Sequence, residues 1–255
     1  MSDLSLVVHQ SRYEIRKFLR DPASTFFTLA LPVVFLVLFV TIFGNQTLES
    51  GIETSTYYVP GLVALAVISA TFVNLSITLT QQRESGVLKR LRGTPLPPWV
   101  FIAGRVATAV ALGLVMAVLL VTLGRVLYGV AVPGSTIVGF VVAIVVGAAT
   151  FSALGIAITA LIPTEAAGPA VANAITLPLF FISGIFVPAE VIPKWLLSIA
   201  GVFPVKPFSD ALLTAFNPAT TGAGIAWGDL AVLGAWGLVG VVVAYRAFRW
   251  APRQS

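Results

Sequence analysis

The chain has 255 residues, of which 58% are hydrophobic and only 10% are charged, and its formal net charge is +5. Soluble domains carry roughly 25% charged residues, so this composition indicates a membrane protein. Cysteine is absent, which excludes disulfides and Cys-based metal sites. We expect one all-α, polytopic membrane domain that covers residues 1–255.

The first segment, residues 4–20, has the pattern of an amphipathic helix. Apolar residues recur at helical spacing from Leu4 to Phe18, and basic residues occupy the other faces. This pattern predicts a helix that lies in the membrane interface, and an ordinary cytoplasmic helix is the alternative. Its interfacial cations are Arg12, Arg16, Lys17 and Arg20. Because about twenty-five mostly polar or amphipathic residues precede the first apolar run, we expect no cleavable signal peptide.

Six apolar stretches follow, each close to the length needed to cross a hydrocarbon core of about 30 Å. They cover residues 26–43, 58–80, 101–127, 136–162, 167–187 and 226–245. Between the last two stretches, prolines recur in a segment that is still rich in Trp, Leu, Ile and Phe. This mixture predicts short outer half-helices at the membrane interface, not a solvated loop.

The basic residues predict an orientation for these six spans. Twelve of the fifteen Lys and Arg residues fall on the side that holds both termini and the segment after the second span. The other three are Arg125, Lys194 and Lys206. The positive-inside rule therefore places both termini in the cytoplasm of a multi-pass protein of the inner (plasma) membrane. The same distribution explains the positive charge without nucleic acid as a partner.

The chain lacks the residues that several classes of membrane protein require, and their absence narrows the possible functions. No Asp, Glu or His lies in the middle of any predicted span, whereas ion-coupled carriers need an ionisable group at membrane depth. The lone histidine, His9, has no second ligand for a metal. No G-x-x-x-x-G-K-[ST] loop occurs, so ATP-driven work requires another chain. We expect no cofactor, metal or catalytic residue in this chain.

Mildly polar residues line parts of the second and fifth spans. Hydrogen bonding between helices explains them most simply. The functional interpretation is a weakly polar path for an amphipathic substrate. The residues of that path are Thr71, Asn74, Thr78, Asn173, Thr176 and Phe180.

The segment after the second span concentrates charge in a chain that has little. Five charged residues fall within ten positions: Arg83, Glu84, Lys89, Arg90 and Arg92. Its sequence, R-E-S-G-V-L-K-R-L-R-G-T-P from Arg83 to Pro95, resembles the R-E-x-G-x-x-x-x-L-x-x-x-P segment of ABC-2 type transporter permeases. A second stretch, P-L-F-F-I-S-G-I-F-V-P from Pro178 to Pro188, is similar to a fifth-span pattern of that family. The resemblance extends over essentially the whole chain and is nearest to the daunorubicin and multidrug-resistance branch.

This resemblance implies a permease that works as a dimer, with an identical or paralogous second permease. It also implies two cytoplasmic ABC ATPase subunits, which hold the ATP and Mg²⁺. The contact with the ATPase is expected in the segment after the second span, where charged side chains pair with the partner and leucines fill a shallow groove. Gly86 is expected to bend the chain there. The contact residues are Arg83, Glu84, Ser85, Gly86, Leu88, Lys89, Arg90, Leu91 and Arg92.

Three functions stay open at this point. The first is export of amphipathic drug-like or lipid-like compounds out of the cytoplasm, and the second is export of polysaccharide or lipid-linked glycan. A glycan path calls for aromatic residues along inward faces, and we expect aromatic residues mainly at span ends and in the fifth span. The third is a membrane assembly or signalling protein that transports nothing.

Overall fold

A computed structural model of the chain describes residues 22–48, 51–93 and 98–247, together with separate positions between Leu6 and Arg20. Within these ranges the chain is helical, apart from turns, short extended connections and an isolated bridge between Thr47 and Glu53. The all-α prediction is confirmed. Most of the predicted interfacial helix over 4–20, including Lys17, lies outside the described residues, so that helix stays a prediction.

The elements follow the predicted spans closely. In chain order they are α2 (Pro22–Phe43), α3 (Thr54–Ile68), η1 (Ser69–Val73), α4 (Asn74–Glu84), α5 (Val87–Arg92), α6 (Pro98–Tyr128), α7 (Ile137–Ile158), α8 (Ala167–Ile182), η2 (Ala189–Val191), α9 (Lys194–Val202), α10 (Val205–Thr214) and α11 (Trp227–Ala247).

Four continuous helical stretches of the described chain have the length and hydropathy of membrane spans. They are Thr54–Glu84, Trp99–Tyr128, Ile137–Ile158 and Trp227–Ala247. Two further apolar helices lie at the first and fifth predicted spans: α2 (Pro22–Phe43) contains the predicted residues 26–43, and Ala167–Ile182 is shorter than the predicted 167–187. The chain is therefore a multi-pass membrane protein, and the number of six spans stays a prediction. Asp229 lies in the first turn of α11, at one end of the last span.

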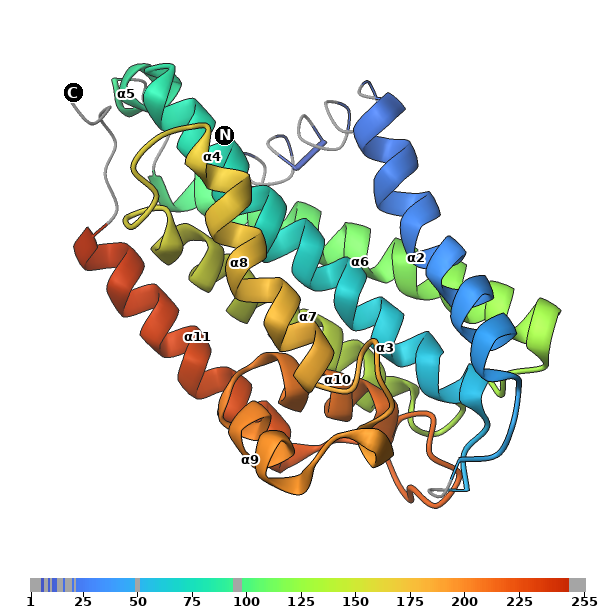
Figure 1. Cartoon of the computed structure of the whole chain (residues 1–255). Helices are drawn as coiled ribbons and strands as arrows, with labels where there is room; N and C mark the ends of the chain where they lie inside the picture. The colour runs from blue at the N-terminus through green and yellow to red at the C-terminus, as the bar shows by residue number, and fades with distance from the viewer. Residues whose placement is uncertain are drawn as a thin grey trace.

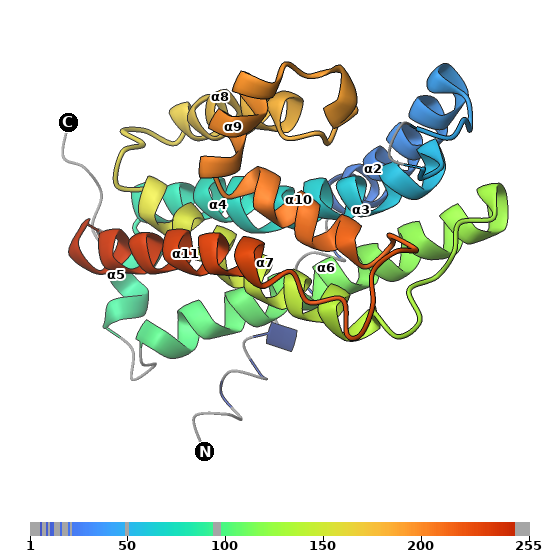
Figure 2. The same ribbon diagram turned by 90° about the horizontal axis from the view of Figure 1, so that it is seen from below.

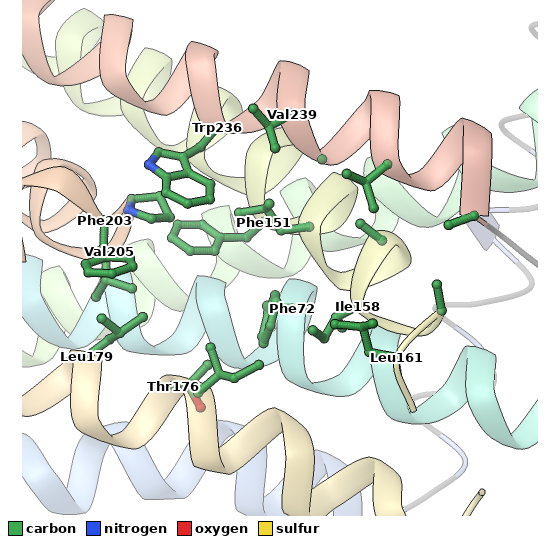
Figure 3. A pocket seen from close by; sticks show the side chains of 18 residues that line it. Phe72, Phe151, Ile158, Leu161, Thr176, Leu179, Phe203, Val205, Trp236 and Val239 are labelled. Atoms are coloured by element: carbon green, nitrogen blue, oxygen red, sulfur yellow. The ribbon is translucent and has the colours of Figure 1, made fainter. Parts of the chain in front are cut away.

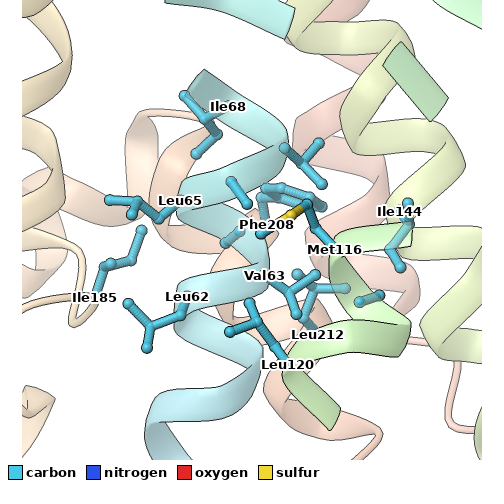
Figure 4. Packing of buried hydrophobic residues seen from close by; sticks show 14 of the residues in the cluster. Leu62, Val63, Leu65, Ile68, Met116, Leu120, Ile144, Ile185, Phe208 and Leu212 are labelled. Atoms are coloured by element: carbon cyan, nitrogen blue, oxygen red, sulfur yellow. The ribbon is translucent and has the colours of Figure 1, made fainter. Parts of the chain in front are cut away.

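The stretch Thr54–Glu84 is the central element of the molecule. Of its most apolar window 67% is buried, whereas only 11% of the corresponding window of α11 is buried. Side chains of α3 such as Leu62 and Ile68 pack against Leu120 of α6 and Phe208 of α10 (Figure 4). Helices α2 and α11 flank this centre and expose many aliphatic side chains, as surfaces in contact with lipid do.

A short π-helix, η1, interrupts the central stretch at Ser69–Val73. Single π-turns of this kind often mark functional positions because they shift the register of the residues that follow. Within this turn, the Thr71 hydroxyl donates a hydrogen bond of 2.6 Å to the Val67 carbonyl of α3. The side chain of Phe72, from the same turn, is 7% exposed.

Helices α7 and α11 pack closely because small residues line their contact. A Cβ atom at Gly240 would lie 2.9 Å from the Leu154 nitrogen and 3.1 Å from the Ala153 Cβ. The Thr150 hydroxyl donates to the Leu233 carbonyl across the same contact, at 3.1 Å. Small residues of α7 and α11 thus allow the two helices to pack closely.

The two ends of the molecule differ in character. The α4–α5 corner lies at one end, and the segment that contains α9 and α10 lies at the other (Figure 1). Seen from below, α3, α4 and α10 lie between the pair α8 and α9 and the pair α6 and α7 (Figure 2).

The segment between α8 and α11 contains the predicted half-helices. Helices α9 and α10 meet at an angle of 98°, with Pro204 at the break. The Tyr57 hydroxyl ties this end to the central helix, because it donates to the Gly184 carbonyl at 2.8 Å and accepts from the Ala189 amide at 3.2 Å. Lys206 and Asp210 form an ion pair of 2.6 Å within α10.

Candidate functional site

The predicted contact segment forms a tight corner between two helices. Helix α4 ends at Glu84, and α5 begins at Val87. Gly86, between them, has a φ of +71°, a left-handed conformation that L side chains rarely adopt. The expected bend at Gly86 is present.

Arg83 lies inside this corner, with 2% of its side chain exposed. Its Nη1 and Nη2 each donate a 2.8 Å hydrogen bond, to the carbonyls of Thr159 and Ile162, and its Nε donates to Glu84 at 2.7 Å. Both carbonyls belong to the turn that ends α7, where the helix dipole favours a cation. The predicted pairing of Arg83 with an acidic partner residue is not met in this structure, because the side chain is buried and three of its five N–H donors bond within the chain.

Leu88 is buried as well, with 0% of its side chain exposed. It packs in a small cluster with Leu79 of α4, Phe101 of α6 and Ile156 of α7, and Leu91 packs against that cluster. Leu88 thus anchors α5 to three helices and does not present itself to a groove on a partner. The expectation that Leu88 fills a groove on the ATPase is therefore not met in this structure.

The rest of the segment forms the outward surface of the corner. Ser85, Lys89 and Arg90 are exposed, and Glu84 and Leu91 are partly exposed. Arg92 ends α5, and its side chain lies outside the described part of the structure. The corner therefore presents a short basic surface on a firmly packed base.

A second buried arginine supports the corner from α6. Arg105 is 7% exposed, donates to the Gln82 side-chain oxygen at 2.8 Å and lies 4.6 Å from the centre of the Phe101 ring. Nearby, the Ser11 hydroxyl donates to the Gly104 carbonyl at 3.1 Å. The described cations of the N-terminal segment, Arg12, Arg16 and Arg20, are exposed.

Sequence reasoning missed the partners of both arginines. The acceptors of Arg83 are backbone carbonyls, which leave no trace in residue type, and they lie 76 and 79 positions away. Gln82, the partner of Arg105, borders the charged motif but is itself uncharged, so the charge pattern does not indicate it.

An apolar cavity of about 360 Å³ lies between η1, α7, α8 and α11. Figure 3 shows aliphatic and aromatic side chains that point into it from these helices and from the bend between α9 and α10. Its lining includes Phe72, Phe151, Leu179, Phe203, Val205 and Trp236. Among the lining side chains, Thr176 donates to the Ala172 carbonyl at 3.0 Å, and the Trp236 indole donates to the Val202 carbonyl at 2.7 Å.

The residues predicted for a polar substrate path lie in different surroundings, and the path stays a prediction. Thr176 lines the cavity. Asn74 and Thr78 bond each other at 2.9 Å on one face of α4, and Asn173 is exposed on α8. Thr71 is bonded within its own helix, and Phe180 is buried beside Phe186. The aromatic residues of the cavity, in contrast, lie on inward faces that the sequence did not indicate.

Comparison with known proteins identifies the family. The family described as "ABC-2 type transporter" matches residues 7–217. The chain belongs to the ABC-2 type transporter family.

Named relatives of this ABC-2 chain are transport permeases. It is 23% identical over 154 residues to the probable multidrug ABC transporter permease YbhR of Escherichia coli. The matched residues are 60% of the chain and 42% of YbhR. It is 22% identical to the putative transport permease YvfS of Bacillus subtilis, over 80% of the chain and 83% of YvfS. It is 29% identical to the daunorubicin resistance ABC transporter permease protein DrrB1 of Streptomyces coeruleorubidus, over 74% of the chain and 67% of DrrB1. The resemblance inferred from the two motifs is confirmed.

Proposed function

We propose that this chain is the membrane-spanning subunit of an ATP-driven exporter and that the α4–α5 corner receives the motion of a separate ABC ATPase. The buried contact of Arg83 carries the proposal. It joins the corner to the end of α7, so a force applied to α5 acts on two membrane helices together. The exposed Lys89 and Arg90 supply the charge that attracts an acidic partner surface.

The central helix gives this motion a path to the opposite end of the membrane. Thr54–Glu84 is a continuous helical stretch of 31 residues, and a helix rises about 1.5 Å per residue. Its far end holds Tyr57, which is bonded to the segment after α8 through Gly184 and Ala189. A push at the corner is thereby transmitted toward the α9–α10 segment, which acts as the outer closure in this proposal.

The remaining parts of the assembly follow from the family. Two ATPase subunits bind ATP and Mg²⁺ in the cytoplasm, and a second permease, identical or paralogous, completes the pair. The chain lies in the inner (plasma) membrane with both termini cytoplasmic, and transport is directed outward.

The substrates are amphipathic, drug-like or lipid-like compounds. The printed names of YbhR and DrrB1 refer to multidrug transport and daunorubicin resistance. The cavity favours the same class over glycans. Its aromatic rings could stack on sugars, but the hydroxyl proton of Thr176 and the indole N–H of Trp236 are already donated to carbonyls. Sugar hydroxyls placed there would lose their hydrogen bonds to water without replacement, which costs free energy.

The test is accumulation of a fluorescent amphipathic drug in a drug-sensitive host. We expect cells that express the chain together with its ATPase to retain less daunorubicin than cells in which the ATPase lacks its phosphate-binding lysine. Equal accumulation in both strains would contradict drug export. New glycan on the cell surface, which depends on the same lysine, would favour the glycan exporter instead.

A further inference from the structure

We propose that the cavity between α7, α8 and α11 binds one hydrocarbon chain, which belongs to a membrane lipid or to a lipid-like substrate. The inference rests on the proposed function and makes its substrate class more specific. Inside the cavity the ligand is recognised by apolar contact, and its polar head stays outside.

The lining fits a hydrocarbon and nothing more polar. The floor is formed by Phe72 and Phe151, which are 7% and 2% exposed. The two hydrogen-bonding side chains of the lining donate to backbone carbonyls, so a ligand finds no free donor there. Apolar cavities of this kind exclude water and take up apolar ligands.

The entrance faces the bilayer. Exposed aliphatic residues rim the cavity on both sides: Ile175 from α8, and Val239 and Val243 from α11. Figure 3 shows Val239 of α11 on one side of the cavity and Thr176 and Leu179 of α8 on the other, with Phe72 and Phe151 between them. A chain can therefore enter sideways from the hydrocarbon core while its head remains at the interface.

The outer end of the cavity is closed by the α9–α10 bend. Phe203, Pro204 and Val205 lie across it. Trp236 of α11 holds this cover in place, because its ring stacks on Phe203 at 6.1 Å and its indole bonds the Val202 carbonyl. The bound chain thus contacts the outer segment directly, next to the proposed outer closure.

The volume of the cavity suits a single hydrocarbon chain. About 360 Å³ is near the lower end of ligand pockets, which hold roughly 300–1,000 Å³. A single chain of methylene groups suits this size, the apolar lining and the exposed aliphatic rim, so we commit to a hydrocarbon chain.

The experiment uses the full-length chain in nanodiscs and two photoreactive probes. One arm contains phosphatidylcholine with a diazirine in its acyl chain. The other contains unlabelled lipid with added diazirine-bearing palmitate. After illumination, mass spectrometry locates the adducts. We expect adducts at the floor residues Phe72 and Phe151, which lipid around the outside of the protein cannot reach. The arm that gives them identifies the source of the chain.

Matched variants test whether the probe reaches Phe72 and Phe151 through the cavity. Ala157→Phe fills the lining, and Ile175→Phe narrows the exposed entrance without a change in the floor. We expect both to lower floor adducts by roughly tenfold, equivalent to about 1.4 kcal/mol. Ala235→Phe adds the same bulk on an exposed position of α11 outside the lining and should leave the yield unchanged.

Two results would overturn the proposal. One is labelling confined to outward residues such as Leu238, equal in all variants, which means contact with surrounding lipid only. The other is the absence of adducts at Phe72 and Phe151 in chains that are recovered as cross-linked pairs. That result means that a second copy covers the cavity. Neither result bears on export, because the assay contains no ATPase. A failure of export would likewise leave the binding result standing.

Discussion

Arg83 is buried and bonded inside the protein, although its sequence neighbours suggest an exposed charge. It stands among exposed charges, and its neighbours Lys89 and Arg90 do lie at the surface. Its own guanidinium is buried because two carbonyls of the α7 end and the Glu84 carboxylate satisfy it. A charge is tolerated inside a protein only with such partners, and these partners leave no signature in residue type. The motif was identified from sequence, but the direction of its first side chain was not.

Replacement of Arg83 by Met should destabilise the protein. It leaves the carbonyls of Thr159 and Ile162 without their donor, and each unsatisfied buried group costs about 1–3 kcal/mol. We expect a clearly lower unfolding midpoint for the purified protein in mild detergent. The matched variant Arg90→Met changes an exposed arginine of α5 and should move the midpoint little. Equal midpoints for the two variants would contradict the structural role of Arg83.

At the scale of elements, the apolar runs predicted the helices because a long uncharged stretch can satisfy its backbone in lipid only as a helix. The span predicted at 167–187 begins at Ala167 as the helix does, but α8 already ends at Ile182. The span predicted at 58–80 is part of a longer stretch, Thr54–Glu84. The π-turn η1 and the angle of 98° between α9 and α10 were not predicted. Both depend on contacts between helices that are far apart in sequence.

The contact between α7 and α11 depends on Gly240. Leucine there would place its Cβ within about 3 Å of the α7 backbone at Ala153 and Leu154, and a backbone cannot yield as a side chain can. We expect Gly240→Leu to separate the two helices and to lower the unfolding midpoint. A Cβ atom at Gly234, on the same helix, meets no atom within 4 Å, so Gly234→Leu serves as the control. Faster proteolysis of the first variant alone would support the prediction, and similar behaviour of both would refute it.

For the whole molecule, the predicted topology requires the two ends to face opposite sides of the membrane. The α4–α5 corner and the α9–α10 segment do lie at opposite ends (Figure 1). The distribution of basic residues predicts that the corner faces the cytoplasm, and this orientation stays a prediction. The cavity between α7, α8 and α11 was not predictable, because its lining comes from five separate parts of the chain.

Cysteine labelling tests the orientation directly, since the chain has no cysteine of its own. Ser135 lies exposed in the turn before α7, and Ser85 lies exposed at the corner. An impermeant maleimide should label Ser135→Cys in intact cells, and it should label Ser85→Cys only after the membrane is opened. The opposite pattern would show that the corner faces outward and would exclude a cytoplasmic ATPase there.

The central claim is that ATP hydrolysis on another chain is coupled to this one through the corner. The most direct measurement is the ATPase activity that co-purifies with the tagged chain from its native membranes. We predict that the double variant Lys89→Glu and Arg90→Glu loses this activity, because both charges lie exposed on α5. The control, Arg125→Glu and Lys194→Glu, reverses two exposed charges outside the corner and should retain it. Equal activity in the two double variants would contradict the account.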